Sequence, residues 1–494
     1  MTEIKELPKG WTTAIFDDLL DYIQPTEFIV ATTDYDDNYA TPVLTPGKSF
    51  IIGYTNETAG IFNTLPVIIF DDFTTATKFV NFPFKVKSSA MKILAPACSL
   101  VNIMYAFYFM QAIQMNTDTH KRYWISVYSQ KQIPLAPQNE QARIVAKIEE
   151  LFSEIDKGVE NFSTAREQLK VYRQALLKHA FEGKLTEKWR KDHTDVEPAS
   201  ELLKRILIKR RKKWEEAELD NMRAMGREPK DDNWKVNYRE PLVPDYNSLP
   251  TLSMSWAWCY SDQLFSFVTS GSRGWAKYYS DEGPIFLRIG NLDHDSIDLD
   301  LSDIQHVRPP KGAEGTRTRV RTNDILISIT ADVGMIAIIP ENIDEAYINQ
   351  HISLVRPIEI TPAKYIAWFL ASRKGQKQFQ NMQRGATKVG LGLDDIKSIN
   401  IPLPPIAEQM EIISQIEEGL SVIDEMEKEI DSNLKLAVNL RQSILKKAFT
   451  GQLVLQDPND EPASLLLERI RAEREAAQQE GKQNKQMRGM RKIA

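Results

Sequence analysis

Three short stretches of the chain carry residue types that catalytic motifs use. Gly47-Lys48-Ser49 is the triplet with which a phosphate-binding loop holds a nucleotide, but that loop needs a glycine at position 42, where this chain has proline. Asp344-Glu345 has the acidic pair of a helicase motif, without an accompanying nucleotide loop. The proline pairs at 309–310 and 404–405 lack the preceding Asn or Asp and the following aromatic residue of an amino-methyltransferase site. We therefore expect no catalytic residue, and no ATP or S-adenosylmethionine bound by this chain itself.

The amino-acid composition limits the classes of protein to which this chain can belong. The chain has 494 residues, 42% hydrophobic and 26% charged, with a net charge of −6, which favours several globular domains without a global basic surface. Cys98 and Cys259 have no partners at metal-ligand spacing, so no zinc site is expected. Two isolated thiols and an N-terminus without a signal peptide indicate the cytoplasm. The most apolar stretch, 93–113, contains Pro, Ser, Asn and Gln, and we interpret it as a buried helix rather than a membrane span.

The chain repeats one segment. Residues 133–185 align with residues 401–453 without a gap, and 21 of the 53 positions are identical. Both copies begin with Ile-Pro-Leu and a Glu-Gln pair, and they end as RQALLKHAFEGKL and RQSILKKAFTGQL. Such self-similarity indicates an internal duplication.

Each copy predicts a long amphipathic helix. Prolines precede the helix, an acidic residue occupies its first turn, and a glycine (Gly183, Gly451) follows its end. Apolar residues recur at intervals of seven, at Ile148, Ile155, Phe162, Leu169 and Leu176, and at Ile416, Ile423, Ile430, Ala437 and Ile444. This narrow stripe needs a partner, and the two copies are expected to pair with each other in antiparallel fashion. The alternative is two independent surface helices.

The segments before the two helices predict two mixed α/β globules. Trp11 and Asp17 in the first occupy the places of Trp256 and Asp262 in the second, and strand-like runs follow in both. Apolar helices are expected near 97–113 and 362–382. The predicted layout is a first globule at 1–132, a helix at 133–187, a charged linker with a helix at 188–250, a second globule at 251–400, a helix at 401–455 and a polar tail at 456–494. The fold class is α+β, with a pseudo-two-fold internal repeat.

The twin helix entrances, the twin RQ-x2-LK-x-AF-x-G-x-L helix ends and the two dissimilar globules resemble the DNA-specificity subunit of a type I restriction–modification system. The resemblance covers the whole chain in order. It departs from the usual pattern at Ala136–Asn139, where a Pro-Pro-hydrophobic run is typical.

The resemblance implies a non-catalytic subunit without a cofactor. Each globule would be a target recognition domain that reads one half of a split, asymmetric site in double-stranded DNA. The paired helices would form an antiparallel coiled coil that sets the spacer and binds two methylation subunits, which methylate adenine. Two restriction and motor subunits would complete the assembly. No membrane partner is expected.

Candidate DNA contacts must lie in loops or at strand ends, where they can reach phosphates or base edges. Arg273, in the glycine-containing stretch SGSRG, is the preferred base-reading candidate because small neighbours allow close backbone approach. The full set in the first globule is Lys85, Lys87, Ser88, Ser89, His120, Lys121, Arg122 and Tyr123; in the second it is Ser272, Arg273, Lys277, Tyr278, Arg384, Thr387 and Lys388.

Two questions stay open at the level of sequence. Residues 201–218 are expected to be helical, and seven of the ten residues 204–213 are Lys or Arg; they form either a solvated helix face or a phosphate-contacting or partner-docking surface. The rival functions are a stand-alone bivalent DNA-binding regulator, which the net charge disfavours, and a nuclease–methyltransferase fusion, which would need the missing motifs and several hundred more residues.

Overall fold

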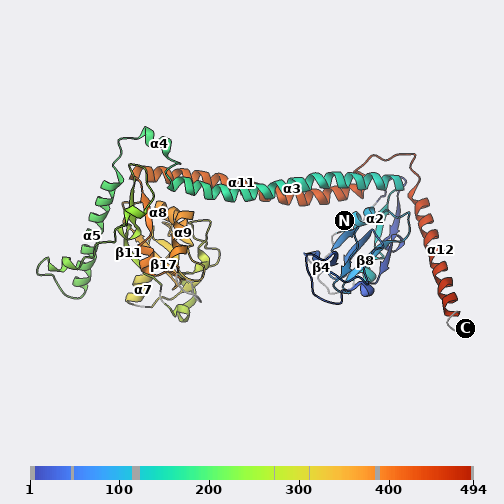
Figure 1. Cartoon of the computed structure of the whole chain (residues 1–494), viewed down its shortest axis with the longest axis horizontal. Helices are drawn as coiled ribbons and strands as arrows, with labels where there is room; N and C mark the ends of the chain where they lie inside the picture. Colours follow the sequence, from blue (N-terminus) through green and yellow to red (C-terminus); the bar gives the residue numbers. More distant parts are fainter. Residues whose placement is uncertain are drawn as a thin grey trace. The chain divides into compact units, whose positions relative to one another are not determined.

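The computed structural model describes residues 6–45, 49–113, 123–271, 273–310, 312–383 and 390–490. The chain divides into two compact units, one formed by residues 1–164 with 430–494 and the other by residues 165–429. Each unit holds one globule and a part of each long helix (Figure 1). None of the described helices combines the length and the apolar character that a membrane crossing requires.

The first globule is built on a four-stranded antiparallel sheet in the order β2–β8–β5–β6. A second, three-stranded sheet has the order β4–β3–β7, and a β1–β9 ribbon leads into the long helix. The elements are β1 Thr12–Ile15, α1 Phe16–Leu19, β2 Leu20–Ile23, η1 Pro25–Phe28, β3 Thr41–Leu44, β4 Ile51–Thr55, β5 Val67–Asp71, β6 Thr77–Val80, β7 Lys85–Val86, β8 Met91–Pro96, α2 Ile103–Ala112, the π-helical η2 Trp124–Tyr128 and β9 Gln132–Leu135. The apolar stretch 93–113 thus divides into a buried strand and the buried helix α2.

The second globule repeats this plan. Its main sheet has the order β11–β17–β14–β15, beside a β13–β12–β16 sheet and a β10–β18 ribbon. The elements are β10 Ala257–Tyr260, α6 Ser261–Leu264, β11 Phe265–Ser270, η5 Trp275–Tyr278, β12 Tyr279–Leu287, η6 Ile289–Asn291, β13 His306–Val307, α7 Ala313–Thr318, β14 Ile325–Ser328, β15 Ile336–Ile338, β16 Ala346–Ile348, β17 Ile352–Pro357, α8 Ala363–Ala371, α9 Arg373–Met382, α10 Leu393–Lys397 and β18 Asn400–Leu403. The single helix expected near 362–382 is two helices, because extended Ser372 ends α8 and caps α9.

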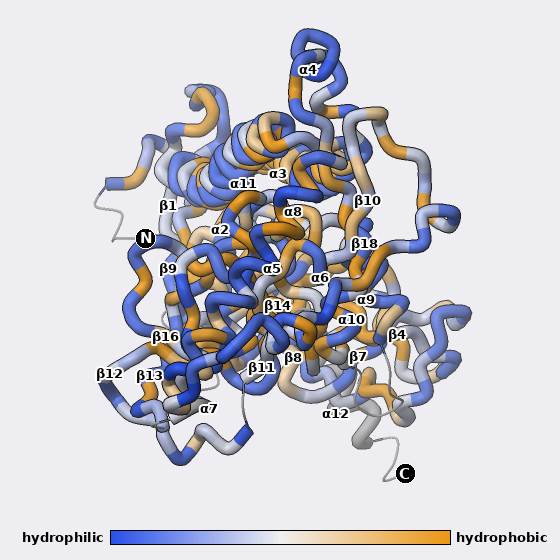
Figure 2. Tube along the Cα trace, turned by 90° about the vertical axis from the view of Figure 1, so that its left-hand side faces the viewer, coloured by the Kyte–Doolittle hydropathy of each residue, from blue (hydrophilic) through white to orange (hydrophobic). Residues whose placement is uncertain are grey.

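The two repeat segments form the long helices α3 Gln138–Phe181 and α11 Ile406–Ala448. Each is followed by a glycine in the left-handed conformation, as predicted, at Gly183 (φ 71°) and Gly451 (φ 70°). Both helices carry hydrophobic as well as hydrophilic residues (Figure 2). Buried stripe residues such as Ile148 and Ile416 join the core of their own unit, which is what amphipathic spacing predicts.

The helices are antiparallel within each unit. In the second unit, Arg173 of α3 donates to Asp424 of α11 at 2.7 Å. In the first unit, Arg441 of α11 donates to Asp156 of α3, and its guanidinium lies 4.5 Å from the Phe152 ring centroid. Arg173 and Arg441 occupy the same position of the repeat, and so do Asp156 and Asp424. One ion pair therefore occurs twice, as the predicted pseudo-two-fold pairing requires.

Buried hydrogen bonds join each globule to the long helix that follows it, and we call each such set of bonds a lock. The indole of Trp11 donates to Glu140 Oε2 at 3.0 Å, and the indole of Trp256 donates to Glu408 Oε2 at 2.9 Å. A tyrosine hydroxyl on the globule also donates to the carbonyl of the entrance proline in each copy, Tyr105 to Pro134 at 2.7 Å and Tyr365 to Pro402 at 2.5 Å. These buried bonds orient each globule on its helix.

The charged linker and the tail each contain a helix docked on a globule. These helices are α5 Ala199–Ala224, preceded by α4 Glu187–Asp192 and followed by η3 Asn233–Asn237 and η4 Tyr246–Ser248, and α12 Ala463–Met490. In α12, Leu466, Leu467 and Ile470 are buried in the core of the first unit. The prediction of a simple polar tail at 456–494 was wrong for this segment, because three apolar residues on one helical face suffice to dock it.

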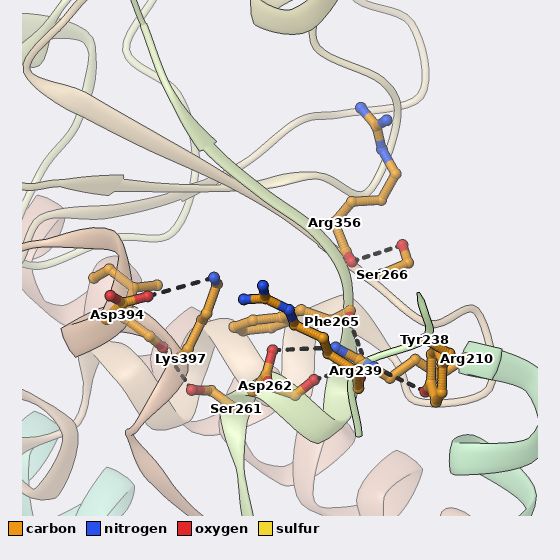
Figure 3. A network of polar contacts seen from close by, with 11 residues as sticks. Arg210, Tyr238, Arg239, Ser261, Asp262, Phe265, Ser266, Arg356, Asp394 and Lys397 are labelled. Atoms are coloured by element: carbon orange, nitrogen blue, oxygen red, sulfur yellow. Dashed lines mark hydrogen bonds and ion pairs between the residues drawn. The ribbon is translucent and has the colours of Figure 1, made fainter. Parts of the chain in front are cut away.

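Matching positions of α5 and α12 contact matching positions of the globules. Arg210 of α5 donates to the Asp262 carboxylate at 3.2 Å, to the Phe265 carbonyl at 3.2 Å and to the Tyr238 hydroxyl at 2.8 Å (Figure 3). Arg474 of α12, at the position of Arg210, lies 3.9 Å from the carboxylate of Asp17, the counterpart of Asp262, and also donates to Asp21 at 2.7 Å. The duplication therefore extends past the long helices into their docked successors.

Candidate nucleic-acid interface

Each main sheet has one end beside its helix lock and one end away from it. In the first globule, Leu20 and Pro96 pair at the near end, and Ile23, Asp71 and Met91 lie at the other, which we call the distal end. In the second globule, Phe265 and Pro357 pair at the near end. The distal end of this second sheet holds Ser270, Ser328 and Ile352. The two distal ends are equivalent because the strand orders are equivalent.

The structure brings the described candidates of the first globule, apart from Lys85, together at its distal end. Lys87, Ser88 and Ser89 form the turn before β8, and Lys87 and Ser89 are exposed. The amide of Asp72 donates to the Ala90 carbonyl at 3.3 Å, and the Asp72 carbonyl accepts from the Tyr123 amide at 3.2 Å. Two candidate segments that are distant in sequence therefore meet at Asp72. Tyr123 itself is buried, so its ring supports this surface from beneath.

The Asp72 carboxylate organises this end. It accepts from the Trp124 amide at 2.8 Å and lies 3.6 Å from the Lys92 ammonium. Lys92 also donates to the Ser89 carbonyl at 3.3 Å. A buried carboxylate with a cation and an amide donor is a satisfied structural group, so Asp72 holds the turn in place without exposing negative charge.

Lys85 does not belong to the exposed surface. Its ammonium is buried, donates to the Ala59 carbonyl at 2.6 Å and pairs with Glu57 at 2.9 Å. Glu57 also accepts from the backbone amides of Ala31 and Thr32 at 2.8 and 3.1 Å. The hydrogen bond from Lys85, helped by these amides, holds the pKa of Glu57 below its usual range. Lys85 therefore ties two loops together, and its buried ammonium is unavailable for a DNA contact.

Replacing Lys85 by methionine is expected to destabilise the first unit by about 2 kcal/mol, because it strands a partly buried carboxylate. Since the pKa of Glu57 is lowered in the folded state, this stability is present above the unfolded-state pKa and lost as the pH falls through the folded-state value. Urea unfolding of Lys85→Met between pH 7 and pH 3 should show the difference from the parent shrinking. The neighbouring variant Lys87→Met should leave stability unchanged, and equal losses in the two variants would contradict this assignment.

The described candidates of the second globule lie at its distal end as well. Arg273, Lys277 and Tyr278 follow β11, and Arg273 and Lys277 are exposed. Trp275 anchors this segment, since its buried ring stacks on Phe286 at 5.5 Å. A side chain at Gly271 would place Cβ 2.1 Å from the Asn349 carbonyl oxygen, so only glycine fits there.

Two further basic residues join this segment, and the sequence reasoning missed both. The Arg308 amide donates to the Tyr278 carbonyl at 2.8 Å, which places exposed Arg308 beside Lys277. Arg317 donates to the Ser270 carbonyl at 2.6 Å and to the Thr269 hydroxyl, so it fixes the end of β11. The run RTRVR at 317–321 was the available signal, but nothing local in it indicates proximity to β11.

Within the described part of the chain, Arg273, Lys277 and Arg308 form no ion pair, although the Lys277 ammonium lies 4.9 Å from the Tyr278 ring centroid. Three cations without an ion pair, two on the segment after β11 and one beside it, suit phosphate contacts. The remaining candidates lie outside the described residues: His120, Lys121, Arg122, Ser272, Arg384, Thr387 and Lys388. The residues that follow 384–389 return to the same distal end, where Gly390 bridges Thr330.

The basic run of α5 has a different environment. All seven of its cations between 204 and 213 have a carboxylate partner. Lys209 and Lys213, for example, both pair with Glu359 of the second globule, at 3.3 and 2.6 Å. Together with the buried Leu202 and Ile206, this pairing favours a face docked on the globule over a phosphate-contacting surface.

Comparisons with known proteins agree with this architecture. Residues 314–436 match the family model described as the type I restriction modification DNA specificity domain. The chain is 42% identical over 190 residues to the type I restriction enzyme EcoR124I/EcoR124II specificity subunit of Escherichia coli, covering 35% of this chain and 45% of that protein. It is 27% identical over 381 residues to the EcoBI specificity subunit of Escherichia coli, covering 75% of this chain and 70% of that protein.

A solved structure of a type I R-M system, described as showing complex assembly and conformational transition, contains a chain with the same fold. The TM-score is 0.60 at 16% identity, and the match covers 91% of this chain and all of that chain. The predicted α+β fold, with two globular domains and two paired long helices, is thereby confirmed. By the family match, the curated relatives and the duplicated architecture, the chain is similar to the DNA specificity subunits of type I restriction–modification systems.

Proposed function

We propose that this chain is the non-catalytic sequence reader of a type I restriction–modification complex, and that each globule reads one half of an asymmetric, bipartite DNA site. The observation that carries the proposal is the convergence of the candidate residues on equivalent distal ends of two sheets with the same strand order. The globules share a scaffold and differ in their distal residues. A duplicated reader of this kind binds two different short sequences.

The helices α3 and α11 have the second role. Their pairing holds the two readers at a set separation, and half-sites about one helical turn apart are about 34 Å centre to centre. We propose that the same helices scaffold two methylation subunits, which bind S-adenosylmethionine and methylate adenine in each half-site. Restriction and motor subunits then join for ATP-dependent cleavage. Their number, two, is part of the proposal.

The decisive experiment is a methylome. The chain is expressed with its methylation subunit in a host without DNA methylation, and modified adenines are mapped by single-molecule sequencing. The expected result is one split motif with two dissimilar halves and a constant gap. A continuous motif, or no motif combined with tight DNA binding by the purified chain alone, would instead favour a stand-alone DNA-binding regulator.

The basic segment of the second globule gives a matched test of the interface. Replacing Arg273, Lys277 and Arg308 together by alanine should reduce the slope of log K against log salt by up to about 2.7, because each phosphate contact contributes about 0.9. The control replaces Lys204 and Lys212 of α5, which are exposed but ion-paired, and should leave the slope unchanged. Equal slopes in the two variants would place DNA elsewhere on the second globule.

A further inference from the structure

The turn between β5 and β6, residues 72–76, holds its shape through Asp71. The Asp71 carboxylate accepts from the Phe73 amide at 3.0 Å and from the Thr74 hydroxyl, and the Asp71 carbonyl accepts from the Thr75 amide at 2.9 Å. Thr75 has a φ of 60°, a conformation that costs a β-branched residue free energy. A strained residue that several hydrogen bonds hold in place is a recurrent feature of functional surfaces.

This turn presents an aromatic ring to solvent. Phe73 is 47% exposed, whereas Phe70, three positions earlier, is fully buried against Trp124 and Tyr128. Leaving an aromatic side chain in water forfeits burial free energy that the fold could otherwise use. The hydrogen-bonded turn therefore keeps this ring at the surface, although its burial would have been favourable.

The surroundings of Phe73 indicate what the ring contacts. Asp72 bonds to Ala90 and Tyr123, so Phe73 adjoins the turn that carries Lys87, Ser88 and Ser89. An exposed aromatic ring with a cation and hydroxyls nearby matches a DNA groove, where phosphates lie beside base edges and the thymine methyl is the apolar group.

The equivalent turn of the second globule lacks this ring. Between β14 and β15, Ala331 has the same left-handed backbone (φ 65°) and is exposed, and no aromatic residue occurs in residues 329–335. The two globules thus have a left-handed residue in the corresponding connection, which spans residues 72–76 in the first globule and 329–335 in the second, and only the first connection carries an aromatic side chain. A scaffold shared by two readers that differ in sequence preference should vary at such positions.

We propose that Phe73 is a specificity-determining residue of the first recognition domain, and that its ring makes an apolar contact with the 5-methyl group of a thymine in the half-site read by that domain. The inference rests on the proposed function. It adds an apolar base contact to a surface otherwise described by polar and basic candidates.

The test uses the chain in complex with its methylation subunit and a duplex bearing the site from the methylome. Each thymine of the first half-site is replaced in turn by deoxyuridine, which removes only the methyl group. For the parent, one replacement should weaken binding about fourfold, since a buried methyl contributes about 0.8 kcal/mol. For Phe73→Ala that replacement should have no effect, and Phe73→Leu, which stays apolar, should retain part of it.

The methylome of Phe73→Ala supplies the second readout. Its motif should be relaxed at one position of the first half-site, with the second half-site unchanged. Recognition of the unchanged second half-site also shows that the Phe73→Ala variant is folded. If Phe73→Ala kept the parent's first half-site and its sensitivity to deoxyuridine, the inference would be overturned. It would also be overturned if Phe73→Ala lost binding to the methylation subunit regardless of DNA sequence, because Phe73 would then be a protein contact. If the parent itself gives no split motif, the proposed function fails instead.

Discussion

Replacing Glu408 by glutamine is expected to destabilise the second unit by about 2–3 kcal/mol, whereas Glu140→Gln, at the same place in the other repeat, is expected to be neutral or stabilising. Glu408 is fully buried and accepts from Trp256, from Thr186 at 2.7 Å and from Arg190. Removing its charge leaves the mostly buried Arg190 guanidinium without its counterion.

Glu140 has a different environment. It is almost fully buried and accepts from Trp11, but within the described residues its Oε1 lacks a partner, and the nearby Arg143 pairs with Asp460 at 2.7 Å. Burial raises the pKa of Glu140, against the lowering effects of the Trp11 bond, of Arg143 and of the Gln456 side chain. A group with a raised pKa in the folded state contributes stability below the unfolded-state pKa and loses it as the pH rises through the folded-state value. The benefit of Glu140→Gln should therefore be largest at alkaline pH and vanish in acid.

Amide hydrogen exchange of the complete chain measures the effect of each variant on its own ribbon separately. In Glu408→Gln, amides of the β10–β18 ribbon should exchange about 30- to 150-fold faster, the factor that 2–3 kcal/mol implies. Amides of the β1–β9 ribbon should be unaffected in that variant and equally or better protected in Glu140→Gln. If both variants destabilise their own ribbon to the same degree, the asymmetry between the two locks has no energetic consequence.

The second large effect concerns the gap between the half-sites. Inserting one heptad into α3 after Thr164 and one into α11 after Ser432 should lengthen the recognised gap by about three base pairs and leave both half-sites unchanged. Seven residues add about 10.5 Å of helix, and DNA rises about 3.4 Å per base pair. A heptad preserves the apolar stripe, and the two insertion points face each other in the antiparallel register of the repeated ion pairs.

The methylome of this variant measures the gap directly, and the original site should no longer be modified. The control inserts three residues into α3 alone, which shifts the stripe off the partner helix and should reduce stability and activity together. An unchanged gap in an active heptad variant would contradict the role of the helices as the spacer.

Much of the architecture is predictable from the sequence because it is encoded locally. Seven-residue spacing, prolines before each helix and Gly183 and Gly451 after them predict α3 and α11, since each signal acts within a few residues of the element it specifies. The duplication predicts the pairing of the helices and the equivalence of Trp11 with Trp256. It also carries the family resemblance that the comparisons confirm.

Which cations are free at the surface is not predictable in this way, because ion pairing depends on carboxylates that are distant in sequence. Lys85 resembled an available cation, but sheet pairing places it within 2.9 Å of Glu57. The basic run of α5 resembled a phosphate-binding face, but Lys209 and Lys213 meet Glu359, about 150 residues away.

The sequence by itself determined the repeat, the long helices, the two α/β globules and the absence of recognisable catalytic motifs. Only the tertiary structure decided which cations are uncompensated, that Arg308 joins Lys277, that α12 docks as a helix and that Phe73 stands exposed on a strained turn. The physical reason is the range of the interactions. Helix periodicity and capping act over a few residues, whereas burial and charge compensation are set by sheet register, which brings together residues that no local pattern connects.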